Sequence, residues 1–71
     1  MTLKEFVEVE GRRWIDLLNE INETMRGYDL ECDLMFMNRL NGLRRGKLKA
    51  RPIELQALLE ITSSSCDSYK D

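Results

Sequence analysis

The segment from Arg12 to Arg26 constrains the fold most, because its apolar residues recur at three- and four-residue steps. This spacing places them along one face of an α-helix, with the carboxylates away from the centre of the stripe. The pattern therefore predicts a long amphipathic helix that ends at Gly27, since glycine readily adopts the left-handed conformation of a helix C-terminus. The predicted apolar face comprises Trp14, Ile15, Leu17, Leu18, Ile21 and Met25.

Signals for a short first helix precede this segment. Thr2 is followed three residues later by Glu5, which is the spacing of a capping box at a helix N-terminus. Gly11 is expected to end this helix by taking a left-handed conformation. The alternative is a helix that continues through Gly11, at a cost of about 1 kcal/mol for the interior glycine.

Two more helices are predicted after Gly27. Asp29 can cap a third helix, which stops near Leu40 or continues to Gly46. Pro52 fits the first position of a last helix, where its missing N–H is not needed, and that helix runs through Thr62. The apolar positions are Leu30, Leu34, Met35, Met37, Leu40 and Leu43 in the third helix and Ile53, Leu55, Leu58, Leu59 and Ile61 in the last.

The expected fold is all-α, since no segment gives a convincing strand with a partner. About four short helices form one compact bundle over residues 1–62 of the 71 in the chain. Residues 63–71 are polar and rich in serine, and are expected to form a flexible tail. Cys66 is therefore expected to expose a reactive thiol, whereas Cys32 is expected to be a small core residue.

Several kinds of activity are excluded by what the chain lacks. It has no histidine, which excludes Ser-His-Asp and Cys-His catalysis, and two cysteines alone cannot complete a zinc site. We expect no enzyme activity, no metal and no cofactor. No apolar run approaches the roughly 20 residues of a membrane span, and the N-terminus has no apolar signal-peptide region. The expected location is the cytoplasm, without membrane association.

The net charge of −2 hides an uneven distribution of charged residues. Residues 1–37 carry four basic and nine acidic side chains, whereas residues 38–51 carry six basic side chains and no acidic one. Residues 52–71 carry one basic and four acidic side chains. A basic segment within an otherwise acidic chain indicates what kind of partner the protein binds, and says little about its fold.

The composition of the basic segment favours contact with nucleic acid. Lysine and arginine neutralise phosphates, asparagine and arginine form paired hydrogen bonds with base edges, and glycine lets the backbone approach a phosphate closely. The alternatives are a solvated basic loop and a surface for an acidic protein. The candidate DNA contacts are Asn38, Arg39, Asn41, Arg44, Arg45, Lys47, Lys49 and Arg51.

The segment Leu43-Arg44-Arg45-Gly46-Lys47, followed by Pro52 at the start of an apolar helix, resembles the Cro/C1-type (Xre-like) helix-turn-helix repressors. Gly27-Tyr28-Asp29 is similar to the turn between the two helices of that motif, and the resemblance covers roughly residues 12–61. It implies a helix-turn-helix-like unit and a transcriptional regulator, a repressor that binds double-stranded DNA. The small size and the resemblance together imply a protein of the kind that phages or plasmids carry.

Two expectations concern protein partners. A homodimer would double the DNA contacts and bury more apolar surface, and the candidate interface residues are Leu3, Phe6, Val7 and Ile61. The alternative function is a helical protein-interaction module, an adaptor or an inhibitor. It would use the acidic faces of the helices to bind a basic partner, and Asp16, Glu20 and Glu23 are its candidate residues.

Overall fold

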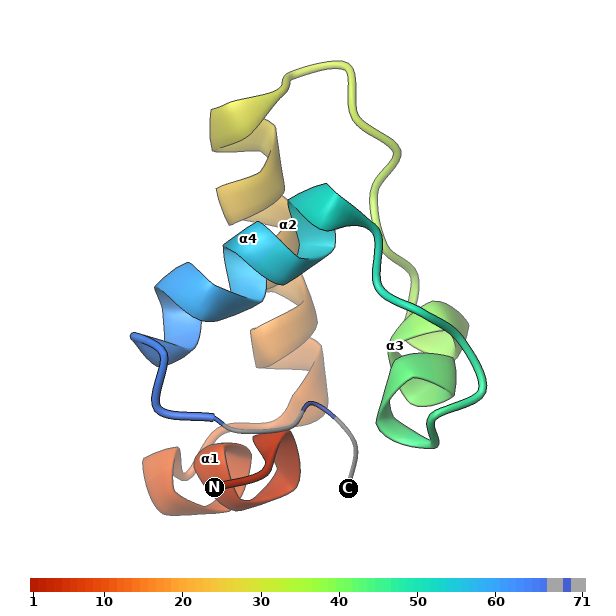
Figure 1. Cartoon of the computed structure of the whole chain (residues 1–71). Coiled ribbons are helices and arrows are strands. Elements are labelled where there is room, and N and C mark those ends of the chain that lie inside the picture. The colour runs from red at the N-terminus through yellow and green to blue at the C-terminus, as the bar shows by residue number, and fades with distance from the viewer. Residues whose placement is uncertain (67–68, 70–71) are drawn as a thin grey trace.

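A computed structural model of the chain describes residues 1–66 and 69. These residues form four helices and no strand ladder, which confirms the all-α fold class. Figure 1 shows α4 crossing α2, with α1 packed below them and α3 standing to one side between two long connections. The helices are α1 (Leu3–Glu10), α2 (Trp14–Tyr28), α3 (Met37–Arg44) and α4 (Pro52–Thr62).

The core lies where α2 meets α4, and α1 and α3 close it from two further sides. Each helix contributes buried apolar side chains, and burial of these side chains is the main force that holds the small domain together. None of the helices in the described part is long and apolar enough to cross a membrane. The buried apolar residues are Leu3, Phe6, Val7, Leu17, Leu18, Ile21, Met25, Met35, Leu40, Leu43, Ala57, Leu58 and Cys66.

The ends of α1 follow the sequence prediction. The backbone N–H of Glu5 donates to the Thr2 hydroxyl at 3.2 Å, and the N–H of Thr2 donates to the Glu5 carboxylate at 3.4 Å. Gly11 has φ = +66°, and the next N–H, of Arg12, donates to the carbonyl of Val7 at 3.1 Å. The helix therefore stops at Gly11, and the alternative of a continuous helix is wrong.

The prediction that α2 ends at Gly27 is wrong. Gly27 lies inside the helix, which extends through Tyr28, and the N–H of Asp29 still donates to the carbonyl of Met25 at 2.9 Å. The Tyr28 hydroxyl donates to the carboxylate of Glu60 and so ties the last turn of α2 to α4. This tertiary contact favours the two extra helical residues, Gly27 and Tyr28, over a helix end at Gly27.

The largest correction concerns residues 29–36, which were expected to begin the third helix but form an irregular connection. The Asn22 side chain holds this segment on α2: it accepts from the N–H of Met35 at 2.7 Å and donates to the carbonyl of Met35 at 2.9 Å. Asp29 accepts from the N–H of Glu31 at 3.0 Å instead of capping a helix. Leu30 and Phe36 remain 81% and 73% exposed, so their spacing does not mark a buried stripe.

The helix α3 consequently starts at Met37 and is short. Its last helical residue is Arg44, and Gly46 just beyond it has φ = +73°, while the N–H of Lys47 donates to the carbonyl of Gly42 at 2.9 Å. This pair of features is a Schellman end, and it confirms Gly46 as the terminator. Since residues 29–36 separate α2 from α3, the tight turn expected at Gly27 is absent, and the pairing of α2 and α3 as a helix-turn-helix unit stays a prediction.

The last helix begins with Pro52 in its first turn and ends at Thr62, as the sequence predicts. The chain beyond it departs from the prediction of an exposed thiol, because Cys66 is buried in the core. Its Sγ donates to the carbonyl of Thr2 at 3.7 Å, which places the start of the expected tail against α1. Tyr69 is half-buried against the core, and the rest of the expected tail after Cys66 lies outside the described residues.

Candidate nucleic-acid interface

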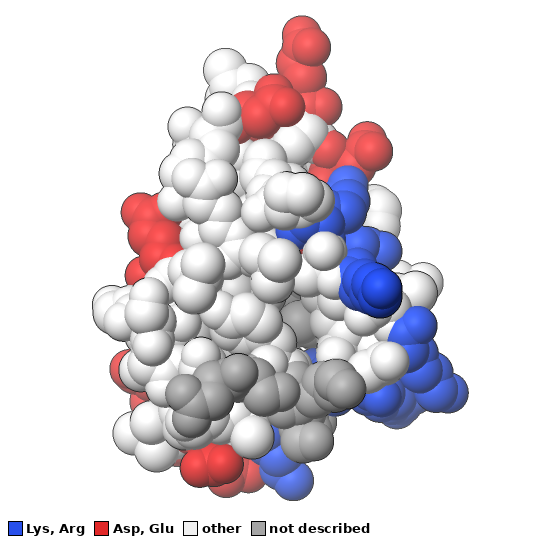
Figure 2. Space-filling model, in the orientation of Figure 1, with Lys and Arg blue, Asp and Glu red and all other residues white. Residues whose placement is uncertain are grey.

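Basic side chains gather on one side of the molecule. Figure 2 shows Lys and Arg along the side formed by α3 and its connection to α4, and Asp and Glu mainly over the top and the opposite edge. The segment from Met37 to Arg51 has no carboxylate of its own, and its exposed cations are Arg45, Lys47 and Lys49. The uneven distribution of charge along the sequence therefore places basic residues on one side of the folded molecule.

The helix α3 presents a polar face to solvent. Leu40 and Leu43 are buried, while Asn38 is exposed and Asn41 is half-buried on the opposite face of the helix. Arg45, at the C-cap, continues the row of Asn38 and Asn41. Two amides and a guanidinium therefore follow one another along the exposed side of a short helix.

Arg44 occupies a different position from its neighbour Arg45. Its guanidinium carbon lies 3.5 Å from the centre of the Trp14 ring, and its Nη1 donates to Oδ1 of Asn41 at 3.3 Å. Trp14 and Arg44 are both half-buried. This stacking is a cation–π contact that holds the end of α3 against the start of α2.

Two of the predicted DNA contacts belong to a buried ion cluster. Arg39 donates through Nε and Nη2 to the two carboxylate oxygens of Glu54, at 2.7 and 2.8 Å. Arg51 donates to the same carboxylate through its backbone N–H at 2.7 Å and its Nη2 at 3.2 Å. The Glu54 side chain is fully buried, with an exposed fraction of 0%. The carboxylate thus receives four N–H donors from these two arginines.

The protonation of Glu54 follows from these contacts. Burial alone would raise the pKa of Glu54, but the hydrogen bonds from Arg39 and Arg51 outweigh it and lower this pKa to about 2. The hydrogen bond to Glu54 in turn raises the pKa of Arg39 above its ordinary value. The cluster therefore stays ionised at neutral pH, and the negative charge of Glu54 is paired with Arg39 and Arg51.

Three of the six cations in residues 38–51 are exposed. We call these three, together with Asn38 and Asn41, the basic face. They are Arg45, Lys47 and Lys49, and within residues 1–66 and 69 none of them forms an ion pair with a carboxylate. Arg39 helps to place them, because its Nη2 donates to the carbonyl of Lys49 at 3.2 Å. The basic face thus combines free positive charge with a backbone that is held in position.

Packing also holds the basic face. The Leu48 side chain lies over Gly42, where an added Cβ would come within 2.6 Å of the Leu48 Cδ1. Only a residue without a side chain lets the connection after α3 fold back this closely onto the helix.

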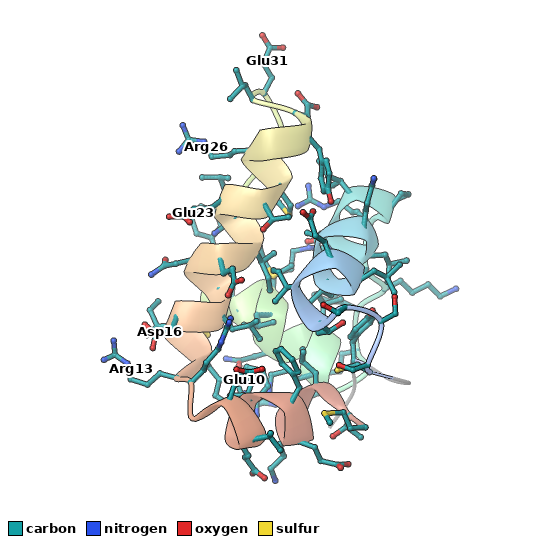
Figure 3. The ribbon with its side chains drawn as sticks, turned by 90° about the vertical axis from the view of Figure 1, so that its left-hand side faces the viewer. Glu10, Arg13, Asp16, Glu23, Arg26 and Glu31 are labelled. Carbon is teal, nitrogen blue, oxygen red and sulfur yellow. The ribbon has the colours of Figure 1, made fainter. Side chains whose placement is uncertain are left out.

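The acidic residues of α2 are arranged differently. Figure 3 shows Asp16 and Glu23 projecting from the outer side of α2, with Arg13 and Arg26 among them. Arg13 donates to Asp16 at 3.1 Å through each of two nitrogens, and this hydrogen bond lowers the pKa of Asp16. Glu20 is paired with Arg12. Two of the three candidate carboxylates for a protein partner are therefore already paired within the chain.

The residues expected at a dimer interface lie mostly inside the molecule. Leu3, Phe6 and Val7 belong to the core, so their side chains offer almost no surface to a second copy, while Ile61 is half-buried. The prediction of a homodimer is left without most of its proposed interface. Exposed apolar side chains on α4 lie instead at Leu55 and Leu59.

Glu54 is the residue of this region that the sequence interpretation missed. A signal for it exists, because Pro52 at the start of α4 places Glu54 at the third position of the helix. A carboxylate there reaches back to the N–H of the capping residue, which here is Arg51.

No protein-family model, curated protein or solved structure matches the chain. The function is therefore argued from the basic face and the acidic helix alone.

Proposed function

We propose that the chain binds double-stranded DNA through the basic face and acts as a small transcriptional regulator. The observation that carries this proposal is the group of three exposed cations, Arg45, Lys47 and Lys49, beside the amides of α3. Cations with no carboxylate partner are free to replace the counterions of phosphates, which is the main source of affinity for DNA.

The geometry of α3 suits contact with a duplex. An α-helix with its side chains is about 10–12 Å in diameter, and the major groove of B-DNA is about 12 Å wide, so a helix fits into it. With Lys47 and Lys49 on phosphates, the polar face of α3 would turn Asn38 and Asn41 toward the base edges. Their amides each offer a donor and an acceptor for hydrogen bonds. The role as a repressor rests on the resemblance to Cro/C1-type proteins.

The test is binding of the purified chain to labelled duplex DNA between 50 and 200 mM salt. For R45A/K47A/K49A we expect the slope of log K against log salt to flatten by about 2.7, because each phosphate contact contributes about 0.9. The affinity at 0.1 M salt should fall several hundred-fold, since each contact is worth about 0.9 of a decade there.

The matched control is K4A/R13A/R26A, which removes the same charge from α1, from the residue before α2 and from α2, and should keep most of the affinity. Random duplex and fragments from the region upstream of the protein's own gene are compared to measure sequence preference. Absence of salt-sensitive binding by the unmodified chain contradicts the proposal. An equal loss in both triple variants contradicts it as well, because the effect would then depend on net charge alone.

The protein-interaction alternative has weaker support from the geometry. It depends on free carboxylates on α2, and Asp16 and Glu20 are already held by Arg13 and Arg12. Glu23 is the one of the three that forms no ion pair within the described residues. A failure of DNA binding would direct the search to a basic protein partner for this side of the molecule.

A further inference from the structure

The cluster around Glu54 joins four parts of the chain. The carboxylate sits on α4, Arg39 comes from α3, and Arg51 ends the connection between these helices. Arg51 also donates through Nη2 to the carbonyl of Asp33 at 2.9 Å, which adds the segment before α3. One buried carboxylate therefore determines where two of the six cations of the basic segment point.

We infer that Glu54 withholds Arg39 and Arg51 from the DNA phosphates, so that the cationic contacts come from the basic face alone. This inference rests on the proposed function and specifies which charges serve it. Glu54 acts as a positioning residue, because it touches no phosphate itself and works through the two arginines.

The reason lies in the cost of separating the cluster. Moving either guanidinium onto a phosphate would leave the Glu54 carboxylate buried with fewer hydrogen bonds, which is unfavourable in a dry environment. A phosphate at the protein surface offers a weaker partner, since water and salt screen it. Arg39 would also give up both carboxylate oxygens, which it contacts in a two-point arrangement.

The backbone gives a second reason. Arg51 donates its own N–H to Glu54, and Arg39 holds the carbonyl of Lys49. Residues 49 and 51 are therefore placed by the same cluster that keeps the two arginines turned inward. Lys49 thereby has a defined position on the basic face, while Arg39 and Arg51 do not contact the DNA phosphates.

The experiment compares two variants that remove one charge each, R39Q and R45Q, in duplex DNA binding between 50 and 200 mM salt. We expect R45Q to flatten the slope of log K against log salt by about 0.9, as the loss of one phosphate contact requires. We expect R39Q to leave the slope unchanged and only to lower the affinity, because Arg39 makes no phosphate contact itself but holds the carbonyl of Lys49. A flattening of about 0.9 by R39Q overturns the inference.

The complementary variant is E54Q, which keeps the shape of the side chain and removes its charge. Release of Arg39 and Arg51 should steepen the slope by about 1.8, whereas a purely structural role would weaken binding without steepening it. Circular dichroism checks that the variant remains helical. An unchanged slope in a folded E54Q overturns the inference, and if E54Q does not fold, the comparison of R39Q with R45Q decides alone.

The outcomes also separate this inference from the proposed function. An unmodified chain without salt-sensitive binding overturns the proposed function and the inference with it. An unmodified chain that binds, and whose slope R39Q and R45Q flatten equally, overturns the inference alone.

Discussion

The outer side of α2 and the basic face are both rich in charged residues, but they differ in how many of these residues form ion pairs. On α2, Asp16 and Glu20 are paired with the arginines Arg13 and Arg12 that stand just before the helix. On the other side, Lys47 and Lys49 have no carboxylate partner within the described residues. The comparison shows that the number of charges in a segment does not tell how many are available to a ligand.

Glu54 makes the same point within the basic segment itself. Arg39, Arg51 and Arg45 cannot be told apart by composition, since all three are arginines of the basic segment. A single glutamate outside the segment, Glu54, pairs with Arg39 and Arg51. The difference between a held and a free cation depends on burial and on a partner from another helix. The following predictions test this contrast between paired and free charges.

The largest effect is expected from acid. The pKa of Glu54 is about 2 in the folded chain against an ordinary value of 4.5, so its stabilising contribution is complete above pH 4.5 and is lost as the pH falls toward 2. The groups facing this carboxylate are Arg39, Arg51 and, through Arg51, Asp33. The shift corresponds to about 3 kcal/mol in the free energy of unfolding.

Urea unfolding of the unmodified chain and of E54Q between pH 6 and pH 2 measures this contribution. E54Q should be less stable near neutral pH, and the difference between the two chains should shrink through the window from 4.5 to 2. A difference that stays constant across this window contradicts the role given to the buried cluster.

A smaller effect is expected at the contact between Gly42 and Leu48, which holds the basic face by packing. Replacing Gly42 by alanine should favour the helix by about 1 kcal/mol. The new methyl group would, however, meet Leu48, and overpacking of this kind costs about 1–3 kcal/mol. We expect G42A to destabilise the chain by about 1 kcal/mol in urea unfolding.

The same substitution in an L48A background supplies the control for this prediction. With the leucine removed, G42A should stabilise the chain, so the sign of its effect should reverse between the two backgrounds. An effect of the same sign and size in both would show that the two residues do not interact.

The smallest effect is expected on the acidic side. The triple variant D16N/E20Q/E23Q makes the chain more positive by three charges, but these positions lie on α2, whereas the basic face lies on α3 and the connection after it. DNA affinity at 150 mM salt should change less than twofold, because charges beyond the screening length of about 8 Å interact weakly. A large gain would mean that net charge, and not the basic face, governs binding.

The local signals of the sequence predicted much of the fold. Thr2, Gly11 and Pro52 act within one turn of their own position, and each marks the helix boundary that it was expected to mark. Most of the apolar stripe of α2 is buried for the same reason, since it needs only a regular helix and a partner surface, while Ile15 at its start is 42% exposed. Elements governed by neighbouring residues are therefore well predicted.

Residues 29–36 show where local signals are insufficient. Asp29 resembles a helix cap, and Leu30, Leu34 and Met37 have helical spacing. The deciding contact is the pair of hydrogen bonds between Asn22 and Met35, which are thirteen positions apart. The burial of Cys66 beside Thr2 is likewise a contact between distant parts of the chain.

In the candidate site, too, some features follow from the local sequence and others depend on distant residues. Its location in the basic segment follows from composition, and the exposure of Lys47 and Lys49 agrees with their place in a connection after α3. The withdrawal of Arg39 depends on Glu54, fifteen positions further along the chain, so composition alone could not indicate it. Only the arrangement of α3 against α4 separates the free cations from the held ones.

The stacking of Arg44 on Trp14 gives the molecule an optical consequence. Trp14 is the chain's single tryptophan, and its ring lies 3.5 Å from the guanidinium carbon of a residue that closes α3. The emission of an indole depends on the charge and the polarity next to its ring. Any ligand that moves the end of α3 therefore changes the intrinsic fluorescence of the chain, which reports occupancy of the neighbouring surface without an added label.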